Sequence, residues 1–164
     1  MESTAFKSVL GVLRVFMGLI FLWAFFDKLL GLGFATTADK AWVAGGSPTF
    51  GFLSFGVHGP FADLYHSIAG SGLVAWLFML GLLFIGVTLT FGIGVRLGTI
   101  SGGVMLLLMY TAVGIQPENH PFIDDHLIYM IVMLLLRLSD SGKYFGFGNA
   151  WSRTALVQKY SFLK

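Results

Sequence analysis

The sequence contains no cysteine, and its 164 residues include only ten Lys and Arg and eight Asp and Glu. Without a thiol the chain cannot form a disulfide, a thiolate metal site, a covalent c-type haem or a dithiol redox relay. The few basic residues form no run that would grip phosphates, so nucleic acid is not an expected partner. Any electron that this protein handles must therefore reside on another molecule.

Hydrophobic residues make up 56% of the chain, and its mean hydropathy is +0.83. Both values are far above those of a soluble domain, and the length suits one compact domain. The composition therefore predicts a single integral membrane domain that contacts the lipid bilayer.

Long apolar runs predict four membrane-crossing helices. Residues 9–26 are interrupted only by Arg14, and residues 73–95 and 97–115 carry no charge, which matches the roughly 20 residues needed to cross a bilayer. A cleaved signal peptide is the alternative for the first run, which is longer than such a segment and contains an arginine. The fourth crossing must use residues 122–138 to be long enough. We therefore predict an all-α bundle of four transmembrane helices near residues 6–31, 72–95, 97–116 and 121–139.

The distribution of basic residues predicts the orientation. With four crossings, eight of the ten basic residues fall on the side of the termini, and only Lys28 and Lys40 fall on the other. The positive-inside rule then places both termini in the cytoplasm, with the chain in the plasma membrane.

About 40 residues between the first two crossings are rich in aromatic residues, and we expect a folded outer cap with short helices beginning at Ser47–Pro48 and spanning 63–68. The tail, residues 142–164, is expected on the inner leaflet.

The first crossing carries polar residues at both ends of one helical stripe. Arg14, Gly18, Phe21, Phe25 and Lys28 follow one another at steps of four, three, four and three. An arginine in hydrocarbon is a functional hint, although near the inner interface it can reach water. Because the inner halves of the other crossings hold only hydroxyl groups, we expect Arg14 to pair with Asp140, a lipid phosphate or another subunit. Asp27 and Lys28 are read either as interface anchors or as part of a polar site.

The segment 119–129, NHPFIDDHLIY, supports two interpretations. Pro121 and the acids that follow it are typical of a helix N-terminus. The functional interpretation places Asp125, His126 and Tyr129 on one face, where they would relay protons from a quinol. A metal site formed by His120, Asp124 and His126 matches no strong ligand pattern, and no histidine lies deep enough to bind haem.

We further expect an outer polar cluster, because the first helix ends at the depth where the fourth begins. In this cluster Lys28 approaches Asp125 or Asp124, with Asp27 and His126 close by. Pairing is the least costly arrangement for charges in a partly dehydrated layer.

Within the second and third crossings, glycines are expected to permit close packing of the backbones. The set comprises Gly81, Gly86, Gly98, Gly102 and Gly103.

These segments together resemble the DoxX/DoxD superfamily, specifically the DoxD-like membrane subunit of thiosulfate:quinone oxidoreductase. The resemblance covers most of the chain and rests on five stretches: RVFMGLIFLWAFFDKLLGLGF at 14–34, GSPTFGFL at 46–53, GP at 59–60, GLLFIGVTLTFGIGVRLG at 81–98 and NHPFIDDHLIYMIVMLLL at 119–136. It implies a four-helix membrane bundle associated with electron delivery to quinone. The family's polar positions correspond here to Arg14, Asp27, Lys28, Asp125 and His126. One departure is Leu82, where many members carry glutamate.

The sequence supports two candidate functions. The first is a quinone-linked oxidoreductase subunit, in which the quinone ring lies among Trp23, Phe25 and Tyr129 while Asp125 and His126 handle protons. Arg14, Asp27 and Lys28 complete the polar site, and neither haem, an iron–sulfur cluster nor a metal is expected in this chain. The second is a non-catalytic accessory or scaffold subunit that packs against other subunits of a larger membrane electron-transfer complex. Transport ranks last, because the middle two crossings offer only scattered hydroxyl groups.

Overall fold

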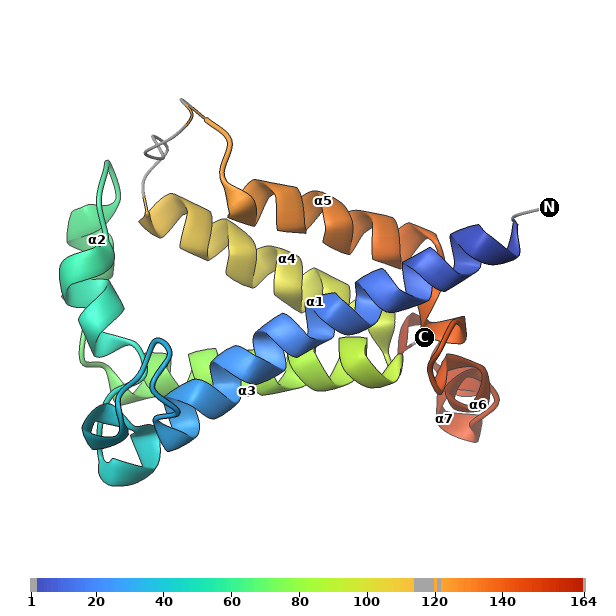
Figure 1. Cartoon of the computed structure of the whole chain (residues 1–164), viewed down its shortest axis with the longest axis horizontal. Helices are drawn as coiled ribbons and strands as arrows, with labels where there is room; N and C mark the ends of the chain where they lie inside the picture. Colours follow the sequence, from blue (N-terminus) through green and yellow to red (C-terminus); the bar gives the residue numbers. More distant parts are fainter. Residues whose placement is uncertain (1–2, 114–119, 121, 164) are drawn as a thin grey trace.

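The computed structural model describes residues 3–113, 120 and 122–163, and its regular structure in these residues is entirely helical (Figure 1). Four long helices form the body: α1 (Thr4–Leu30), α3 (Gly72–Phe91), α4 (Val95–Ala112) and α5 (Asp125–Leu138). Shorter helices lie at the two ends of this body. The all-α class expected from the composition is therefore confirmed.

Three of these helices are long and apolar enough to cross a membrane. The mean hydropathy of the best 18-residue window is 2.3 in α1, 2.3 in α3 and 1.4 in α4, and only 39% of each window is buried inside the protein. The remaining surface of α1, α3 and α4 carries large apolar side chains such as Phe16, Trp76 and Leu107. Exposed apolar surface of this extent suits lipid rather than water as the surrounding solvent.

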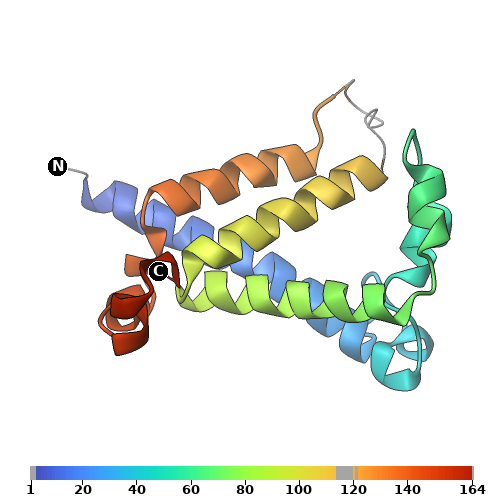
Figure 2. The same ribbon diagram turned by 180° about the vertical axis from the view of Figure 1, so that it is seen from behind.

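The long helices alternate in direction along the chain. α1 packs most extensively on α3, α3 packs on α4, and α4 packs on α5. Both views show the chain termini at the same end of the body, and α2 (Ala62–Ser67) stands at the opposite end (Figures 1 and 2).

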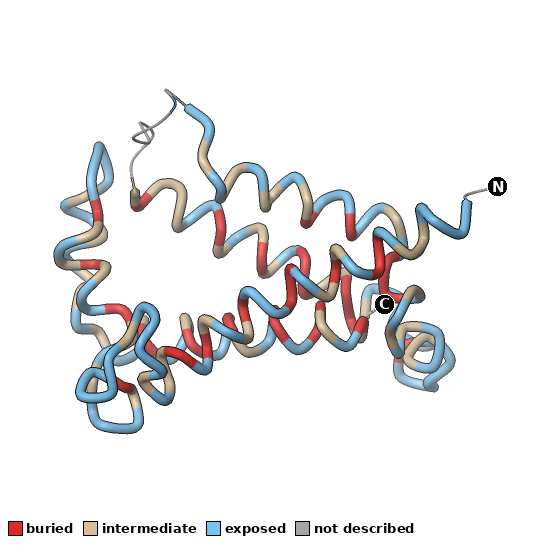
Figure 3. The backbone as a smooth tube through the Cα atoms, in the orientation of Figure 1, coloured by how far each residue is buried: buried red, intermediate tan, exposed pale blue. Residues whose placement is uncertain are grey.

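The core lies where the four long helices face one another, and their outer sides are exposed (Figure 3). Met79, Ile85 and Leu89 of α3 are completely buried, as is Leu136 of α5. Close approach of backbones supports this packing, because a Cβ atom at Gly86 of α3 would lie 2.8 Å from the backbone nitrogen of Leu22 in α1. The expectation of glycine-mediated packing is confirmed there, whereas Gly103 faces open space.

The turn between α3 and α4 differs from the expected boundary at Arg96. Gly92 ends α3 with φ +73°, and Gly94 precedes α4 with φ +64°. These left-handed conformations are readily adopted only by glycine, so the break falls at 92–94, and Arg96 belongs to the first turn of α4. At the far end of α4, the last residues of the expected 97–116 crossing lie outside the described residues.

The fourth long helix is shorter than the expected crossing at 121–139. α5 contains 14 residues, which corresponds to a length of about 21 Å at 1.5 Å per residue. The physical reason is at its start: Asp124 has an extended conformation and its side chain accepts a hydrogen bond from Leu127 N, so the helix begins after the first acid. Residue 121 lies outside the described residues.

The segment between α1 and α3 is folded, as expected. It contains η1 (Ala38–Lys40), η2 (Trp42–Ala44), η3 (Phe52–Gly56) and α2. Ser47 Oγ accepts a hydrogen bond from Phe50 N, which confirms the predicted capping at Ser47–Pro48, and α2 confirms the predicted helix at 63–68. The segment reaches the end of α4, where Tyr65 Oη lies 2.6 Å from Thr111 Oγ1.

The C-terminal tail is also folded. η4 (Ser141–Lys143), α6 (Gly148–Ser152), α7 (Ala155–Lys159) and η5 (Ser161–Leu163) follow α5. Phe147 N donates to Phe91 O at 2.8 Å, and Trp151 Nε1 donates to Leu163 O at 2.7 Å. The first bond holds the tail against the C-terminal end of α3, and the second joins α6 to η5 within the tail.

Candidate functional site

Arg14 is completely buried within α1 and donates hydrogen bonds to four backbone carbonyl oxygens. Nη1 donates to Leu89 O and to Thr90 O, the latter at 3.1 Å. Nη2 donates to Tyr144 O at 2.9 Å and to Phe145 O at 3.0 Å. The guanidinium thus joins α1 to the end of α3 and to the segment after η4. We call this arrangement the arginine clasp.

The clasp satisfies groups that a helix cannot satisfy by itself. The last four carbonyl groups of a helix lack partners within it, and they form the negative end of the helix dipole. Leu89 and Thr90 belong to this last turn of α3. Phe145 adopts a left-handed φ of +51°, and its carbonyl accepts from Arg14. A cation with five donors in a planar fork is well suited to such a set of oxygens.

Among the described residues, the hydrogen-bond acceptors of the Arg14 guanidinium are backbone carbonyl oxygens, so the expectation of Asp140 as its partner within the chain is wrong. A lipid phosphate or another subunit as a further partner stays a prediction. Asp140 instead lies 2.8 Å from Lys143 Nζ. Folding of the tail back onto α3 brings the carbonyls to the guanidinium, so a carboxylate is not needed. No side-chain pattern marks the carbonyl oxygens, and the sequence offered no signal for them.

At the other end of α1, Asp27 organises the exit from the helix. Its buried carboxylate accepts from Phe34 N at 3.1 Å and from Ala35 N at 3.0 Å. Trp23, one turn earlier, contacts the ring of Phe34 edge to face at a centroid distance of 4.9 Å. Lys28 is half-buried, and in the described part of the chain it forms no ion pair or side-chain hydrogen bond.

At the start of α5, Asp124 and His126 form a pair. Asp124 Oδ2 lies 2.6 Å from His126 Nδ1, and Asp124 Oδ1 accepts from Leu127 N at 3.1 Å. Asp125 is exposed, and Tyr129 packs partly against the core. His120 Nδ1 accepts from the backbone of Ile123 at 3.0 Å, and no group of three metal-ligating side chains occurs among the residues that the structure describes.

The predicted outer cluster of Lys28 with Asp125 or Asp124, Asp27 and His126 is wrong. The carboxylates of Asp27 and Asp124 already accept hydrogen bonds from nearby backbone amides. Asp27 accepts from residues 34 and 35, and Asp124 accepts from Leu127. The end of α1 and the start of α5 also lie apart, because α1 packs on α3 while α5 packs on α4 (Figure 1). These local hydrogen bonds take the place of the long-range ion pair with Lys28, which was expected because the residues share a depth in the membrane.

The residues expected to surround a quinone ring do not converge on one cavity. Trp23 is 48% exposed on the outside of α1, whereas Phe25 is 9% exposed and belongs to the core. Tyr129 packs against that core from α5. Neither of two pockets found in the described part of the chain is lined by these three aromatic residues.

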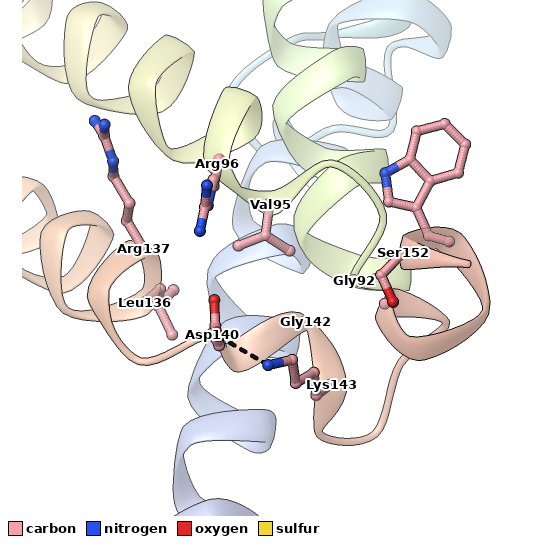
Figure 4. Close-up of a pocket in the computed structure, with 11 residues that line it drawn as sticks. Gly92, Val95, Arg96, Leu136, Arg137, Asp140, Gly142, Lys143 and Ser152 are labelled. Carbon is pink, nitrogen blue, oxygen red and sulfur yellow. Dashed lines mark hydrogen bonds and ion pairs between the residues drawn. The ribbon is translucent and has the colours of Figure 1, made fainter. Parts of the chain in front are cut away.

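One of these pockets lies beside the arginine clasp and has a volume of about 220 Å³. Its wall includes three basic side chains, Arg96 of α4, Arg137 of α5 and Lys143 of η4, together with Asp140 (Figure 4). We call it the basic pocket. In the sequence these cations indicate only the orientation of the chain. Their common position at the ends of helices on one side was the signal that would have grouped them.

The second pocket is an apolar groove on the outer face of α5, lined by residues such as Ile123, Leu127 and Ile131. All of its lining residues are apolar.

Comparison with protein-family models, with curated proteins and with solved structures gives no match to this chain.

Proposed function

We propose that this chain is a membrane subunit linked to quinone-dependent electron transfer, of the thiosulfate:quinone oxidoreductase type, and that it acts there as an accessory subunit rather than as the catalyst. The electron-transfer part of the proposal rests on the sequence resemblance to the DoxX/DoxD superfamily. The accessory part rests on how the polar side chains of the described residues are used.

The observation that carries the accessory role is the occupation of the buried polar groups. Arg14 donates to four carbonyls, Asp27 accepts from two backbone amides, and Asp124 caps α5 while contacting His126. A group that acts in proton transfer must reach a reacting atom. Groups already used to hold backbone segments are suited to maintaining a rigid bundle.

Outer surfaces of the bundle are available to partners within the bilayer. α1 exposes Val9 and Phe16, α3 exposes Leu73 and Trp76, and α5 exposes Ile131, each by more than half of its surface. Small-residue contacts and close packing, rather than burial from water, drive association between helices in lipid. A subunit of this kind contributes shape and anchoring to a complex.

A second candidate function, binding of a quinone by this chain, is favoured by one observation at the end of α1. Trp23 and Phe34 form an aromatic pair at the helix surface, and Trp23 is 48% exposed. Lys28 lies five residues beyond Trp23, near the end of α1, and has no ion-pair partner in the described residues. An aromatic surface and a cationic donor at the same end of a helix suit a quinone ring and its carbonyl oxygen.

Purification of the tagged chain from its native membrane tests both candidates. The accessory role predicts stoichiometric recovery of a redox subunit, with all extractable quinone lost when that subunit is removed by washing. Quinone retained by the isolated chain, and lost in Trp23→Ala but not in the matched control Trp76→Ala, would support the second candidate. Recovery of the chain with neither a redox subunit nor quinone would contradict the proposed function.

A further inference from the structure

The basic pocket is formed where several helices end. Its wall combines residues of the α3–α4 turn, the first turn of α4, the last turn of α5, η4 and α6 (Figure 4). A volume of about 220 Å³ is several times the roughly 30 Å³ occupied by one water molecule in the liquid, so a tetrahedral oxyanion fits inside.

The pocket carries an excess of positive charge. Lys143 and Asp140 form an ion pair at 2.8 Å, with side chains about half exposed at 50% and 52%. Arg96 and Arg137 take part in none of the ion pairs found among the described residues. Three basic side chains and one carboxylate line the pocket, which leaves a net charge of +2 to attract an anion.

Backbone donors add to this charge. The first amides of a helix have no partner within the helix and form the positive end of its dipole. α4 begins at Val95, and its N-cap residue Gly94 provides no side-chain hydrogen bond. Guanidinium groups bind phosphate oxygens through two parallel hydrogen bonds, and helix N-termini commonly bind phosphate.

The surroundings favour a phosphate attached to a lipid over a free ion. The pocket floor includes the apolar side chains Val95 and Leu136, and α3 and α4, two of the helices that are apolar enough to cross a membrane, meet at the turn beside it. Ile131, Leu134 and Leu138 recur along one face of α5 next to Arg137, and Leu138 is 74% exposed. Acyl chains can lie on this face while the headgroup enters the pocket.

We infer that the basic pocket binds the phosphate of an anionic phospholipid headgroup, with Arg96 and Arg137 as the principal ligands. This inference depends on the membrane placement of the helices and is independent of any role in electron transfer. Basic pockets between helices at the cytoplasmic surface are suited to such headgroups. The headgroup would then join α4, α5 and the tail at one point.

The test compares the unmodified protein with Arg96→Gln/Arg137→Gln and with Arg153→Gln, a matched control in the exposed tail outside the pocket. Each protein is reconstituted in nanodiscs of phosphatidylcholine with increasing phosphatidylglycerol, and bound lipid is counted by native mass spectrometry. We expect the unmodified protein and the control to retain phosphatidylglycerol selectively. The double variant should lose at least about tenfold in affinity, the change expected from loss of one charge-assisted hydrogen bond.

Thermal unfolding of the unmodified protein tests lipid binding without any substitution, so misfolding of a variant cannot affect the result. Phosphatidylglycerol should raise its melting temperature more than phosphatidylcholine does. Equal binding of both lipids, or an equal loss in the Arg153→Gln control, would overturn the inference. Stabilisation by inorganic phosphate without preference for phosphatidylglycerol would overturn the lipid assignment, because the pocket would then be a site for a soluble anion.

Discussion

Arg14 and Tyr144 are 130 positions apart in the chain, and the Arg14 guanidinium donates through Nη2 to the Tyr144 carbonyl oxygen at 2.9 Å. The same guanidinium also holds Leu89, Thr90 and Phe145. One side chain thus connects the first helix, the third helix and the tail, and the stability of this end of the bundle should depend on it.

Replacement of Arg14 by methionine is expected to destabilise the protein by about 3–5 kcal/mol, because buried carbonyl oxygens would lose a charged donor. Chemical unfolding in detergent micelles, followed by circular dichroism, measures this change. Lys7→Met is the matched control on the same helix, since Lys7 has no side-chain hydrogen bond or ion pair in the described residues. A similar loss of stability in both variants would show that the clasp contributes no more to stability than the Lys7 side chain does.

The turn after α3 offers a second test. Gly92 has φ +73°, and a Cβ atom there would lie 2.8 Å from Gly142 O and 3.0 Å from Arg14 Nη1. Gly92→Ala should cost at least about 1–2 kcal/mol, the penalty of a left-handed residue with a side chain. Gly103→Ala is the control, because a Cβ atom there meets nothing within 4 Å and alanine favours a helix by up to about 1 kcal/mol. A stability change of the same sign in both variants would argue against this packing.

The two neighbouring acids of α5 should behave differently. Asp124→Ala removes the N-cap that accepts from Leu127 N and is expected to cost about 1 kcal/mol. Asp125→Ala alters an exposed side chain and should leave the unfolding midpoint unchanged. Parallel melting curves of the two variants measure the difference. The reverse order would mean that Asp125, and not Asp124, fixes the start of the helix.

Activity measurements on the same segment separate the proposed functions. An accessory role predicts that the assembled complex reduces quinone at the normal rate with Asp125→Asn and with His126→Ala. The catalytic alternative predicts loss of quinone reduction in both variants while the complex still assembles. Co-purification of the partner subunit is the control for assembly in each case.

The absence of cysteine makes the topology directly testable. Val43 is 67% exposed between α1 and α3, and Arg153 is exposed in the tail. With four crossings, a membrane-impermeant maleimide should label Val43→Cys only from outside the cell and Arg153→Cys only from the cytoplasm. Labelling of both positions from the same side would mean that α5 does not cross the bilayer.

Prediction from sequence worked best where a short segment determines its own local structure. The uncharged runs located α3 and α4, and Ser47–Pro48 located a capped turn, because these signals act over a few residues. It failed for the partners of Arg14 and Lys28, because side-chain pairing was inferred from depth in the membrane. Backbone groups competed successfully for Arg14, Asp27 and Asp124, and every residue has such groups, so no sequence pattern identifies them.

The arginine clasp also sets an order of events during synthesis. Arg14 enters the membrane long before Tyr144 and Phe145 have been translated, and at 5–20 residues per second the interval is about 7–26 s. Throughout that time the guanidinium has no access to the two tail carbonyls that later hold it. The bonds from Arg14 to Leu89 and Thr90 can form once α3 has been made, whereas those to Tyr144 and Phe145 can form only after the C-terminal segment emerges. A chain whose translation stops before Tyr144 therefore lacks the half of the clasp that holds the tail.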